Sequence, residues 1–392
     1  MALLRVVTEC SGLEPLPYIL DQLGLRNKYV IEAACEVDPL CRKVIELCHK
    51  GKARPKRMLT DITKREPAKL PDHDVYVAGF PCQPFSTMGL HEGMADSKGR
   101  GIIIKHIVAA LQHKRPKAFV LENVRGLLAP RHARTFDLIM CKLRSIASNG
   151  YIVGYKVLDT ADYGLPQHRE RVYIVGILRS AMNPKRPFKW PAPRTRVSLR
   201  KYLKWHPDWL QEESRKKQQN LFLATAPPKL KQRLQRVLHQ IQLSGMDPYS
   251  AEKPLVADID ASTPRWMQGR SPCLTRARAA TGHYFPALGR RMSIQERLRL
   301  QGLPEAIYEK CRDKITERQL GQMVGNSLSV NVMVACCGTS SPLAVCPPVS
   351  SQQVQLRAVA VSRVGQHSIH GAACRRGALR HVGVTAAGAH SD

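Results

Sequence analysis

The chain has 392 residues, of which 43% are hydrophobic and 23% are charged, a balance that excludes wholesale disorder and collagen-like repeats. Lys and Arg number 61 against 31 Asp and Glu, so the formal net charge is +30. No fold requires this excess of positive charge. It favours a polyanionic partner, above all a nucleic acid, over a surplus that serves solubility alone.

The composition also restricts the compartment. There is no apolar run of about 18 residues, so we expect no membrane span, and Glu9 interrupts the apolar N-terminus before a signal-peptide core can form. The 12 cysteines include no Cys-x-x-Cys pair, which argues against a zinc site. A chain of this length buries a core without disulfides. The sequence therefore predicts an intracellular protein without a metal.

Short apolar runs alternate with helical patterns through the first half of the chain. We expect strands at 3–8, 29–35, 74–79, 118–122, 151–158 and 171–178, with helices between them. This alternation predicts an α/β fold whose mostly parallel sheet carries helices on both faces. Ligands of such sheets bind at the carboxyl ends of the strands. Glu36, the loop after Gly79 and Glu122 are therefore candidate site residues by topology.

The composition changes near residue 179. Residues 179–265 contain 18 Lys and Arg against 7 Asp and Glu, with clustered prolines, which predicts an inserted, less regular domain with a cationic surface. Helical periodicity returns at 293–302 and 326–337. The expected domains are a split catalytic domain at 1–178 and 266–337, the insert at 179–265, and a disordered basic tail at 338–392.

Two motifs place reactive groups after expected strands. Cys82 lies between two prolines in the segment Gly79-Phe-Pro-Cys-Gln-Pro-Phe-Ser86, and the prolines stiffen the turn that holds its thiol. Taken alone, a nucleophile and a buried structural cysteine are equally good interpretations. Glu122 ends a strand in Leu-Glu-Asn-Val.

Two further motifs lie later in the chain. Arg169 and Arg171 alternate in Gln-His-Arg-Glu-Arg, so both guanidinium groups should face the same side of the sheet, unless they form only a solvated ion-pair face. The Gly325-Asn-Ser327 turn is expected to open the helix at 326–337 with a ready N-cap, and a plain capping turn is the alternative.

The order Pro-Cys-Gln, Glu-Asn-Val, Gln-x-Arg-x-Arg, Gly-Asn-Ser resembles that of the DNA cytosine-5 methyltransferases over residues 3–178 and 266–336. The resemblance implies a Rossmann-like, S-adenosylmethionine-dependent methyltransferase sheet. It also implies that residues 179–265 are the target recognition domain and that the Gly-containing segment 88–101 is a mobile loop that closes over DNA.

The resemblance implies a role for each motif. The Cys82 thiolate would add to carbon 6 of a flipped-out cytosine, so that carbon 5 becomes nucleophilic. Arg169 would favour the thiolate, Glu122 would bind or protonate ring nitrogen 3, and Arg171 would hold the 2-oxo group. The remaining substrate-binding residues are Gln83, Ser86 and Asn123, the last of which would fix the Pro-Cys loop.

The methyl donor that the resemblance implies is S-adenosylmethionine. Glu36 would bind its ribose hydroxyls, and Gly12 would allow close backbone approach. The expected cofactor-binding residues are Cys10, Gly12, Leu13, Glu36, Val37, Asp61, Ile62, Pro81, Asn326 and Ser327. The chain departs from the family pattern Phe-x-Gly-x-Gly-Gly, because Cys10 replaces the aromatic residue, and Glu14 and Pro15 replace two glycines.

Two alternatives stay open. A tRNA cytosine-5 methyltransferase would share the catalytic frame, although the Cys-Phe-Thr tripeptide typical of that branch is absent from this sequence. A catalytically idle DNA-binding homologue would fit the altered first motif. The expected partner is double-stranded DNA and the expected state is a monomer. The altered motif and the basic tail favour the nucleus of a eukaryotic cell, with the cytoplasm as the location otherwise.

Overall fold

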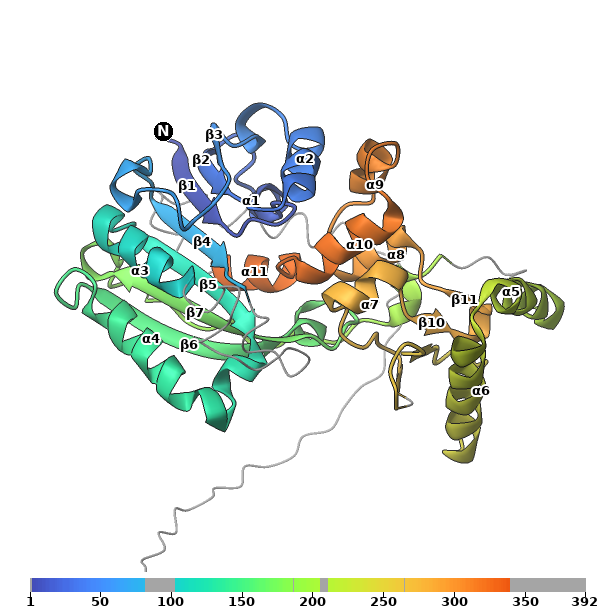
Figure 1. Ribbon diagram of the computed structural model, residues 1–392. Coiled ribbons are helices and arrows are strands. Elements are labelled where there is room, and N and C mark those ends of the chain that lie inside the picture. Colours follow the sequence, from blue (N-terminus) through green and yellow to red (C-terminus); the bar gives the residue numbers. More distant parts are fainter. Residues whose placement is uncertain (1, 82–102, 186, 205–210, 264, 339–392) are drawn as a thin grey trace, which may run out of the picture. The chain divides into compact units, whose positions relative to one another are not determined.

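Seven strands form the main sheet of the protein, in the order β3-β2-β1-β4-β5-β7-β6 (Figure 1). The computed structural model describes residues 2–81, 103–185, 187–204, 211–263 and 265–338. The strands are β1 (Leu4–Glu9), β2 (Tyr29–Cys35), β3 (Arg57–Leu59), β4 (Val75–Gly79), β5 (Ala118–Val124), β6 (Tyr151–Asp159) and β7 (Glu170–Leu178).

The strand directions confirm the predicted α/β fold. The strands from β3 to β5 run parallel, whereas β7 runs antiparallel to both of its neighbours, β5 and β6. The six predicted strands are present. The short β3 was missed because it has only three residues, and its first, Arg57, is exposed. Three residues are too few to display the alternation that marks a strand.

The two faces of the sheet bury different sets of alternating side chains. On one face Val6, Ile31 and Val75 pack with helices α1 (Leu16–Gln22), α2 (Pro39–Cys48) and α11 (Val330–Cys337). On the other face Val7, Ala33 and Tyr76 pack with α3 (Ile103–Lys114) and α4 (Ala133–Ser145). The period of two along each strand thus produces a core on both faces of the sheet. Figure 1 shows the helices that cover these faces. Each fully buried aliphatic side chain stabilises the fold by about 1.5–3 kcal/mol.

The last helices pack beside this sheet, and they correct one prediction. They are α7 (Arg276–Thr281), α8 (Ile294–Leu300), α9 (Ala306–Cys311) and α10 (Glu317–Asn326). The expected helix at 326–337 is wrong at its start. The Gly325-Asn-Ser327 segment closes α10, with Ser327 as the extended C-cap, and α11 begins after Ser329. Ser is common at the start of a helix, at its end and in turns. The local pattern therefore did not distinguish the end of one helix from the start of the next.

A second, smaller sheet has the order β11-β10-β8-β9. Its strands are β8 (Leu255–Ala257), β9 (Trp266–Gln268), β10 (Tyr284–Phe285) and β11 (Arg290–Arg291). Two helices precede it, α5 (Glu212–Thr225) and α6 (Pro228–Leu243), in the segment that was expected to be less regular. Leu234, Val237 and Ile241 of α6 pack against Leu255 and Tyr284 of the sheet. The proposed domain boundaries stay predictions, and residues 339–392 of the tail lie outside the described part of the chain.

Among the described residues, one segment, Glu317–Cys337, is long and apolar enough by length and composition to cross a membrane. It contains the two helices α10 and α11, and 72% of its apolar 18-residue window is buried inside the protein. Buried side chains of both helices belong to the same hydrophobic cluster as β1 and β2. The window is therefore part of the core of the described fold.

We expect Gly176→Ala to destabilise the sheet. Gly176 of β7 lies opposite Phe119 of β5, and an added Cβ would lie 2.1 Å from the Phe119 ring, which is fully buried and has no room to shift. Overpacking of this kind costs about 1–3 kcal/mol, which should lower the melting temperature by several degrees. The matched control is Gly154→Ala in β6, where the nearest side-chain atoms are 4.0 Å away. Equal melting temperatures of the two variants would contradict the expectation.

Candidate active site

Two neighbouring strands bring the predicted catalytic carboxylate next to the start of the Pro-Cys segment. Gly79, the last residue of β4, pairs with Glu122 of β5. A Cβ added at Gly79 would lie 3.8 Å from Glu122 Oε2 and 3.6 Å from the Leu328 side chain. Residues near positions 80, 122 and 328, which are far apart in the sequence, therefore meet at the carboxyl ends of the strands.

Glu122 is buried, with 8% of its surface exposed, and it faces one cation directly. Arg171 Nε lies 3.3 Å from Glu122 Oε1, and both side chains are nearly inaccessible. Burial raises the pKa of Glu122, and the charges of Arg171 and Arg169 oppose this rise. Despite the ion pair, Glu122 Oε1 accepts no hydrogen bond from any described residue. The carboxyl group can therefore still bind a donor or carry a proton.

Arg169 lies immediately before β7 and is only 2% exposed. Its guanidinium donates to the carbonyl oxygens of Leu274 at 3.1 Å, Gly325 at 3.1 Å and Ser327 at 2.8 Å. A planar guanidinium group can donate to these three acceptors at once. A lysine ammonium group cannot reproduce this geometry. Arg169 thus ties the start of β7 to the segment before α7 and to the end of α10.

Cys273 and Gln167 also belong to this region, and the sequence reasoning did not single them out as site residues. The Cys273 sulfur lies 3.8 Å from a guanidinium nitrogen of Arg169 and 3.7 Å from one of Arg171. Both arginines therefore reach the same side, as predicted. Gln167 is fully buried and donates to Leu300 O at 2.8 Å. Gln167 opens the Gln-x-Arg-x-Arg motif, but only the tertiary fold shows that it and Cys273 lie beside these arginines.

Asn123 contacts the residue that precedes the Pro-Cys turn. It is 1% exposed, and its side-chain nitrogen donates to Phe80 O at 3.4 Å. Pro81, which follows Phe80, is partly exposed. The predicted nucleophile Cys82 and the predicted contacts Gln83 and Ser86 lie outside the described residues.

The loop after β1 and the end of β2 form the second part of the site. Gly12 N donates to Glu36 Oε2 at 2.7 Å, and Asp38 N donates to Glu36 Oε1 at 2.9 Å. Burial raises the pKa of Glu36, and these two backbone donors oppose the rise. The other cofactor-binding residues expected near Gly12 and Glu36 differ in exposure. Leu13 is buried in the core, Cys10 is partly buried, and Val37 is 69% exposed.

The remaining cofactor candidates lie at two other loops. Asp61 accepts hydrogen bonds from the backbone and hydroxyl of Thr63, which lower its pKa, and Ile62 is buried beside the sheet. Asn326 is exposed at the end of α10, whereas Ser327 is buried and its hydroxyl donates to Leu328 O.

The loop residues fit a nucleoside-bearing cofactor. Gly12 has φ +56°, and an added Cβ there would meet nothing within 4 Å, so a ligand can approach this backbone closely. The Glu36 carboxylate beside it is a suitable acceptor for ribose hydroxyls. Within the described ranges, no three His, Cys, Asp or Glu side chains gather in a group that could hold a metal ion.

Comparison with known proteins decides the family. The family model for C-5 cytosine-specific DNA methylases matches residues 10–339. The chain belongs to this family. It is 33% identical to the type II methyltransferase M.NgoBI of Neisseria gonorrhoeae over 283 residues, which cover 70% of this chain and 76% of that protein. It is 48% identical to M.HaeII of Haemophilus aegyptius over 133 residues, 34% of this chain and 39% of that one.

Solved structures show the same fold. A mutant of Spodoptera frugiperda DNMT2 superposes with a TM-score of 0.57 at 17% identity, over 84% of this chain and 97% of that one. S. pombe Dnmt2 superposes with a TM-score of 0.53 at 18% identity, over 85% and 96% of the two chains. The chain is thus a DNA cytosine-5 methyltransferase, and S-adenosylmethionine is its methyl donor. Both curated relatives are bacterial, so they do not support the nuclear location that the sequence favoured.

We expect Arg169→Lys to destabilise this methyltransferase by about 2–4 kcal/mol, because lysine leaves at least one buried carbonyl without its donor. The measurement is thermal or urea unfolding. The control is Arg125→Lys, since Arg125 pairs with Glu170 at 2.7 Å but is 65% exposed. An exposed pair contributes no more than about 1 kcal/mol. If both variants unfold alike, Arg169 does not hold the segments together.

Proposed function

We propose that the chain, acting as a monomer on double-stranded DNA, methylates carbon 5 of a flipped-out cytosine through a covalent adduct with Cys82. The thiolate adds to carbon 6, and the electron pair displaced toward the ring makes carbon 5 nucleophilic. Carbon 5 takes the methyl group from the sulfonium, whose electron pair stays on sulfur. A water molecule then takes the carbon 5 proton, the electron pair of that C–H bond re-forms the double bond between carbons 5 and 6, and the thiolate leaves from carbon 6. The target must leave the base stack for this chemistry.

The observation that carries the proposal is the buried Glu122 carboxyl group beside Arg171. A carboxyl group whose pKa is raised by burial can share a proton with ring nitrogen 3 when the adduct forms. Its Oε1 has no hydrogen-bond partner among the described residues, so this oxygen is available to carry the proton that is shared with ring nitrogen 3. Arg171, paired at 3.3 Å, would remain charged beside the 2-oxo group.

Register supports the assignment of the nucleophile. Gly79 pairs with Glu122, so the chain leaves β4 beside the carboxylate and reaches Cys82 three residues later. Asn123 anchors the intervening Phe80 carbonyl. Arg169 would act on the thiolate through its charge, since its guanidinium is already bonded to three carbonyls. In the cofactor site Glu36 and Gly12 would bind S-adenosylmethionine with the other residues named for it.

Cys82→Ser should abolish methyl transfer while DNA affinity stays within about twofold, because a serine hydroxyl is a far weaker nucleophile than a thiolate. The assay is tritiated methyl transfer to duplex DNA, paired with gel-shift binding. Duplex DNA that contains 5-fluorocytosine should trap the wild-type adduct on a denaturing gel, since fluorine cannot leave as the proton does.

The matched control for that experiment is Cys141→Ser, which changes an exposed thiol on α4. It should transfer methyl groups and form the trapped adduct like the wild type. Full activity of Cys82→Ser would refute the role of Cys82. Parallel assays with tRNA test the other substrate class, and methyl transfer confined to tRNA would refute the DNA assignment.

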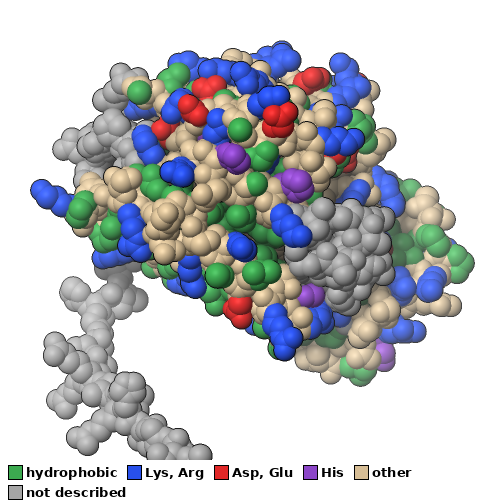
Figure 2. All heavy atoms as spheres, turned by 60° about the vertical axis from the view of Figure 1, so that its left-hand side comes forward, with side chains coloured by type: hydrophobic (Ala, Val, Ile, Leu, Met, Phe, Trp, Pro, Cys, Tyr) green, Lys and Arg blue, Asp and Glu red, His purple; other side chains and the backbone are tan. Residues whose placement is uncertain are grey.

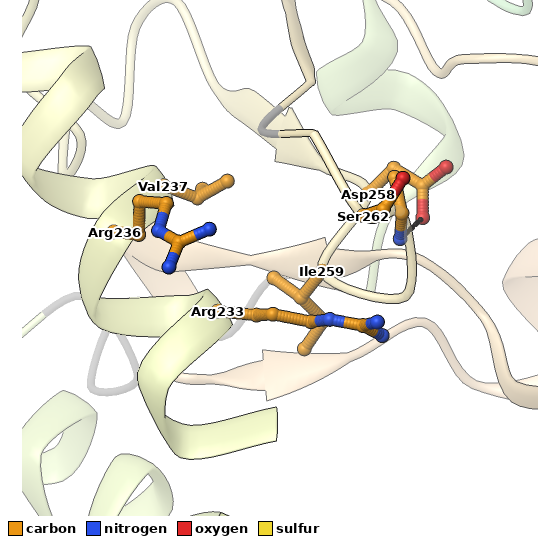
Figure 3. Close-up of a pocket in the computed structure, with 7 residues that line it drawn as sticks. Arg233, Arg236, Val237, Asp258, Ile259 and Ser262 are labelled. Carbon is orange, nitrogen blue, oxygen red and sulfur yellow. Dashed lines mark hydrogen bonds between the residues drawn. The ribbon is translucent and has the colours of Figure 1, made fainter. Parts of the chain in front are cut away.

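DNA recognition is assigned to the segment 179–265, and α6 offers the clearest surface for it. Its 16 residues include four Lys or Arg and no Asp or Glu. Figure 3 shows Arg233 and Arg236 extending from the helix beside the loop that holds Asp258 and Ser262. Arg233 donates to Asp260 O at 3.1 Å, whereas exposed Arg236 has no hydrogen bond or ion pair with a described residue.

The charge of the whole surface is consistent with a phosphate backbone as ligand. The face in Figure 2 carries many Lys and Arg side chains and far fewer Asp and Glu side chains. The net charge of +30 makes long-range attraction of DNA unavoidable at low salt. Because phosphate contacts release counterions, such attraction must weaken as salt increases.

Replacing Lys229 and Arg236 together with Gln should reduce the slope of log affinity against log salt by about 2, one unit for each lost phosphate contact. Both side chains are exposed on α6, so the fold should be unaffected. DNA affinity is measured between about 50 and 200 mM salt. Lys69→Gln, an exposed lysine at 76% outside the insert, is the control and should keep the wild-type slope. An unchanged slope in the double variant would show that α6 does not follow the phosphates.

A further inference from the structure

The loop between β1 and α1 holds an acidic residue in a conformation that usually requires glycine. Glu14 has φ +57°, in the left-handed region, as do its neighbours Cys10 and Gly12. A non-glycine residue there is strained by about 1–2 kcal/mol. The Glu14 side chain nevertheless turns inward and is only 1% exposed. The surrounding contacts must therefore hold both the backbone and the carboxyl group.

These contacts are neutral. Thr8 Oγ1 on β1 donates to Glu14 Oε2, and Leu16 N at the start of α1 lies 3.3 Å from Oε1. Ser11 completes the cluster, since its hydroxyl lies 2.8 Å from Thr8 Oγ1 and its carbonyl accepts from Glu14 N at 2.8 Å. No Lys, Arg or His side chain within the described ranges forms an ion pair with Glu14.

The cations of the surrounding elements form hydrogen bonds and ion pairs with groups other than Glu14: Arg65 pairs with Glu9, Arg42 donates to the carbonyls of Glu36 and Val37, and Lys310 donates to the Cys48 carbonyl. Glu36, at the end of β2, is a second buried carboxyl group, and Tyr29, at the start of β2, has a raised pKa because of burial. His49 follows α2 and lies against the Leu13 carbonyl, and burial lowers its pKa to about 4, so it is neutral at pH 7. A negative charge on Glu14 is therefore uncompensated in the protein alone, which disfavours it.

Burial accordingly raises the pKa of Glu14 to about 7, although the hydrogen bonds from Thr8, Leu16 and Ser11 oppose the rise. Glu14 is two residues from Gly12, whose N–H contacts Glu36 at 2.7 Å. A cation that entered this loop would favour the ionised form of Glu14. S-adenosylmethionine carries such a cation, its sulfonium, whereas the product S-adenosylhomocysteine has a neutral thioether.

We infer that Glu14 is a specificity-determining residue that senses the charge on the cofactor's sulfur: its carboxyl group loses a proton when S-adenosylmethionine binds and thereby favours the substrate over S-adenosylhomocysteine. This rests on assigning the loop 10–15 to the cofactor site. Binding transfers the proton from the carboxyl group to the solvent. After methyl transfer the sulfur regains its electron pair and becomes neutral, Glu14 takes back a proton, and the product is held less tightly.

The test is calorimetric binding of each cofactor form to the full chain at pH 7, in phosphate and in Tris buffer, whose ionisation enthalpies differ. On binding S-adenosylmethionine, the wild type should release more protons than Glu14→Gln does, by a fraction of a proton per molecule. On binding S-adenosylhomocysteine, the two proteins should release the same number of protons. Glu14→Gln should lower the preference for S-adenosylmethionine about tenfold, since a buried charge pair contributes at least this much. Comparison with the variant cancels the titration of the cofactor's own amino group.

The sign of the pH dependence follows from proton release. The affinity of the wild type for S-adenosylmethionine, relative to Glu14→Gln, should rise from about pH 6 to about pH 8 and then level off, because the pKa of about 7 lies between them. Glu46→Gln, which removes an exposed carboxylate of α2, is the control and should match the wild type. Glu14→Gly, which relieves the backbone strain, replaces Glu14→Gln if that variant does not fold.

Two results would overturn the inference. If S-adenosylmethionine binds, but Glu14→Gln leaves both proton release and the preference between the two cofactor forms unchanged, Glu14 is only a structural residue. If the wild type fails to bind S-adenosylmethionine at all, the assignment of the cofactor site is wrong and the inference falls with it. The first result leaves the proposed methyl transfer intact, so the two failures are distinguishable.

Discussion

The guanidinium group of Arg169 holds together three segments that are distant in the sequence. Arg169 immediately precedes β7, and it donates to the carbonyl of Leu274, before α7, and to those of Gly325 and Ser327, at the end of α10. With Arg169 only 2% exposed, water cannot replace these bonds, and their loss would leave buried acceptors unpaired. The same bonds fix where Arg171 emerges two residues later. Arg169 thus has an architectural role, and Arg171 is the arginine that faces Glu122.

Four buried carboxyl groups, those of Glu9, Glu14, Glu36 and Glu122, lie near the carboxyl ends of strands in the main sheet. Glu9 forms an ion pair with buried Arg65. Glu122 has a guanidinium partner, Glu36 has two backbone N–H donors, and Glu14 has a hydroxyl donor. Glu9 and Glu122 thus have a cationic partner, whereas Glu14 and Glu36 form no ion pair with a described residue, although the chain as a whole has a net charge of +30. The positive charge outside attracts a polyanion, and the two carboxyl groups without a cationic partner can favour a cationic ligand.

The sheet and the positions of Glu122 and Arg171 could be predicted because a strand that is buried on both faces of a sheet appears in the sequence as a short, nearly continuous apolar run, which is a local property. The ends of α10 and α11 could not. Gly321 and Gly325 are needed because α10 lies against α7, where an added Cβ would come within 2.5 Å of the backbone. That requirement appears only once both helices are placed. The contact of Cys273 with both arginines is likewise tertiary, whereas the residues around Cys82 lie outside the described chain.

The smaller sheet joins strands from both sides of residue 265. β8 pairs with β9 along Leu255 to Ala257, and it also pairs with β10 where Ala257 faces Tyr284. A chimera that exchanges the whole segment 179–265 for that of a relative would therefore replace the inner strand β8, while its neighbours β9 and β10 still come from this chain, so both pairings must form anew. The two helices α5 and α6 can be exchanged without cutting this sheet, provided that the graft keeps the apolar residues Leu234, Val237 and Ile241. If the segment 179–265 reads the DNA sequence, as we propose, exchange of the two helices tests that role while the sheet stays intact.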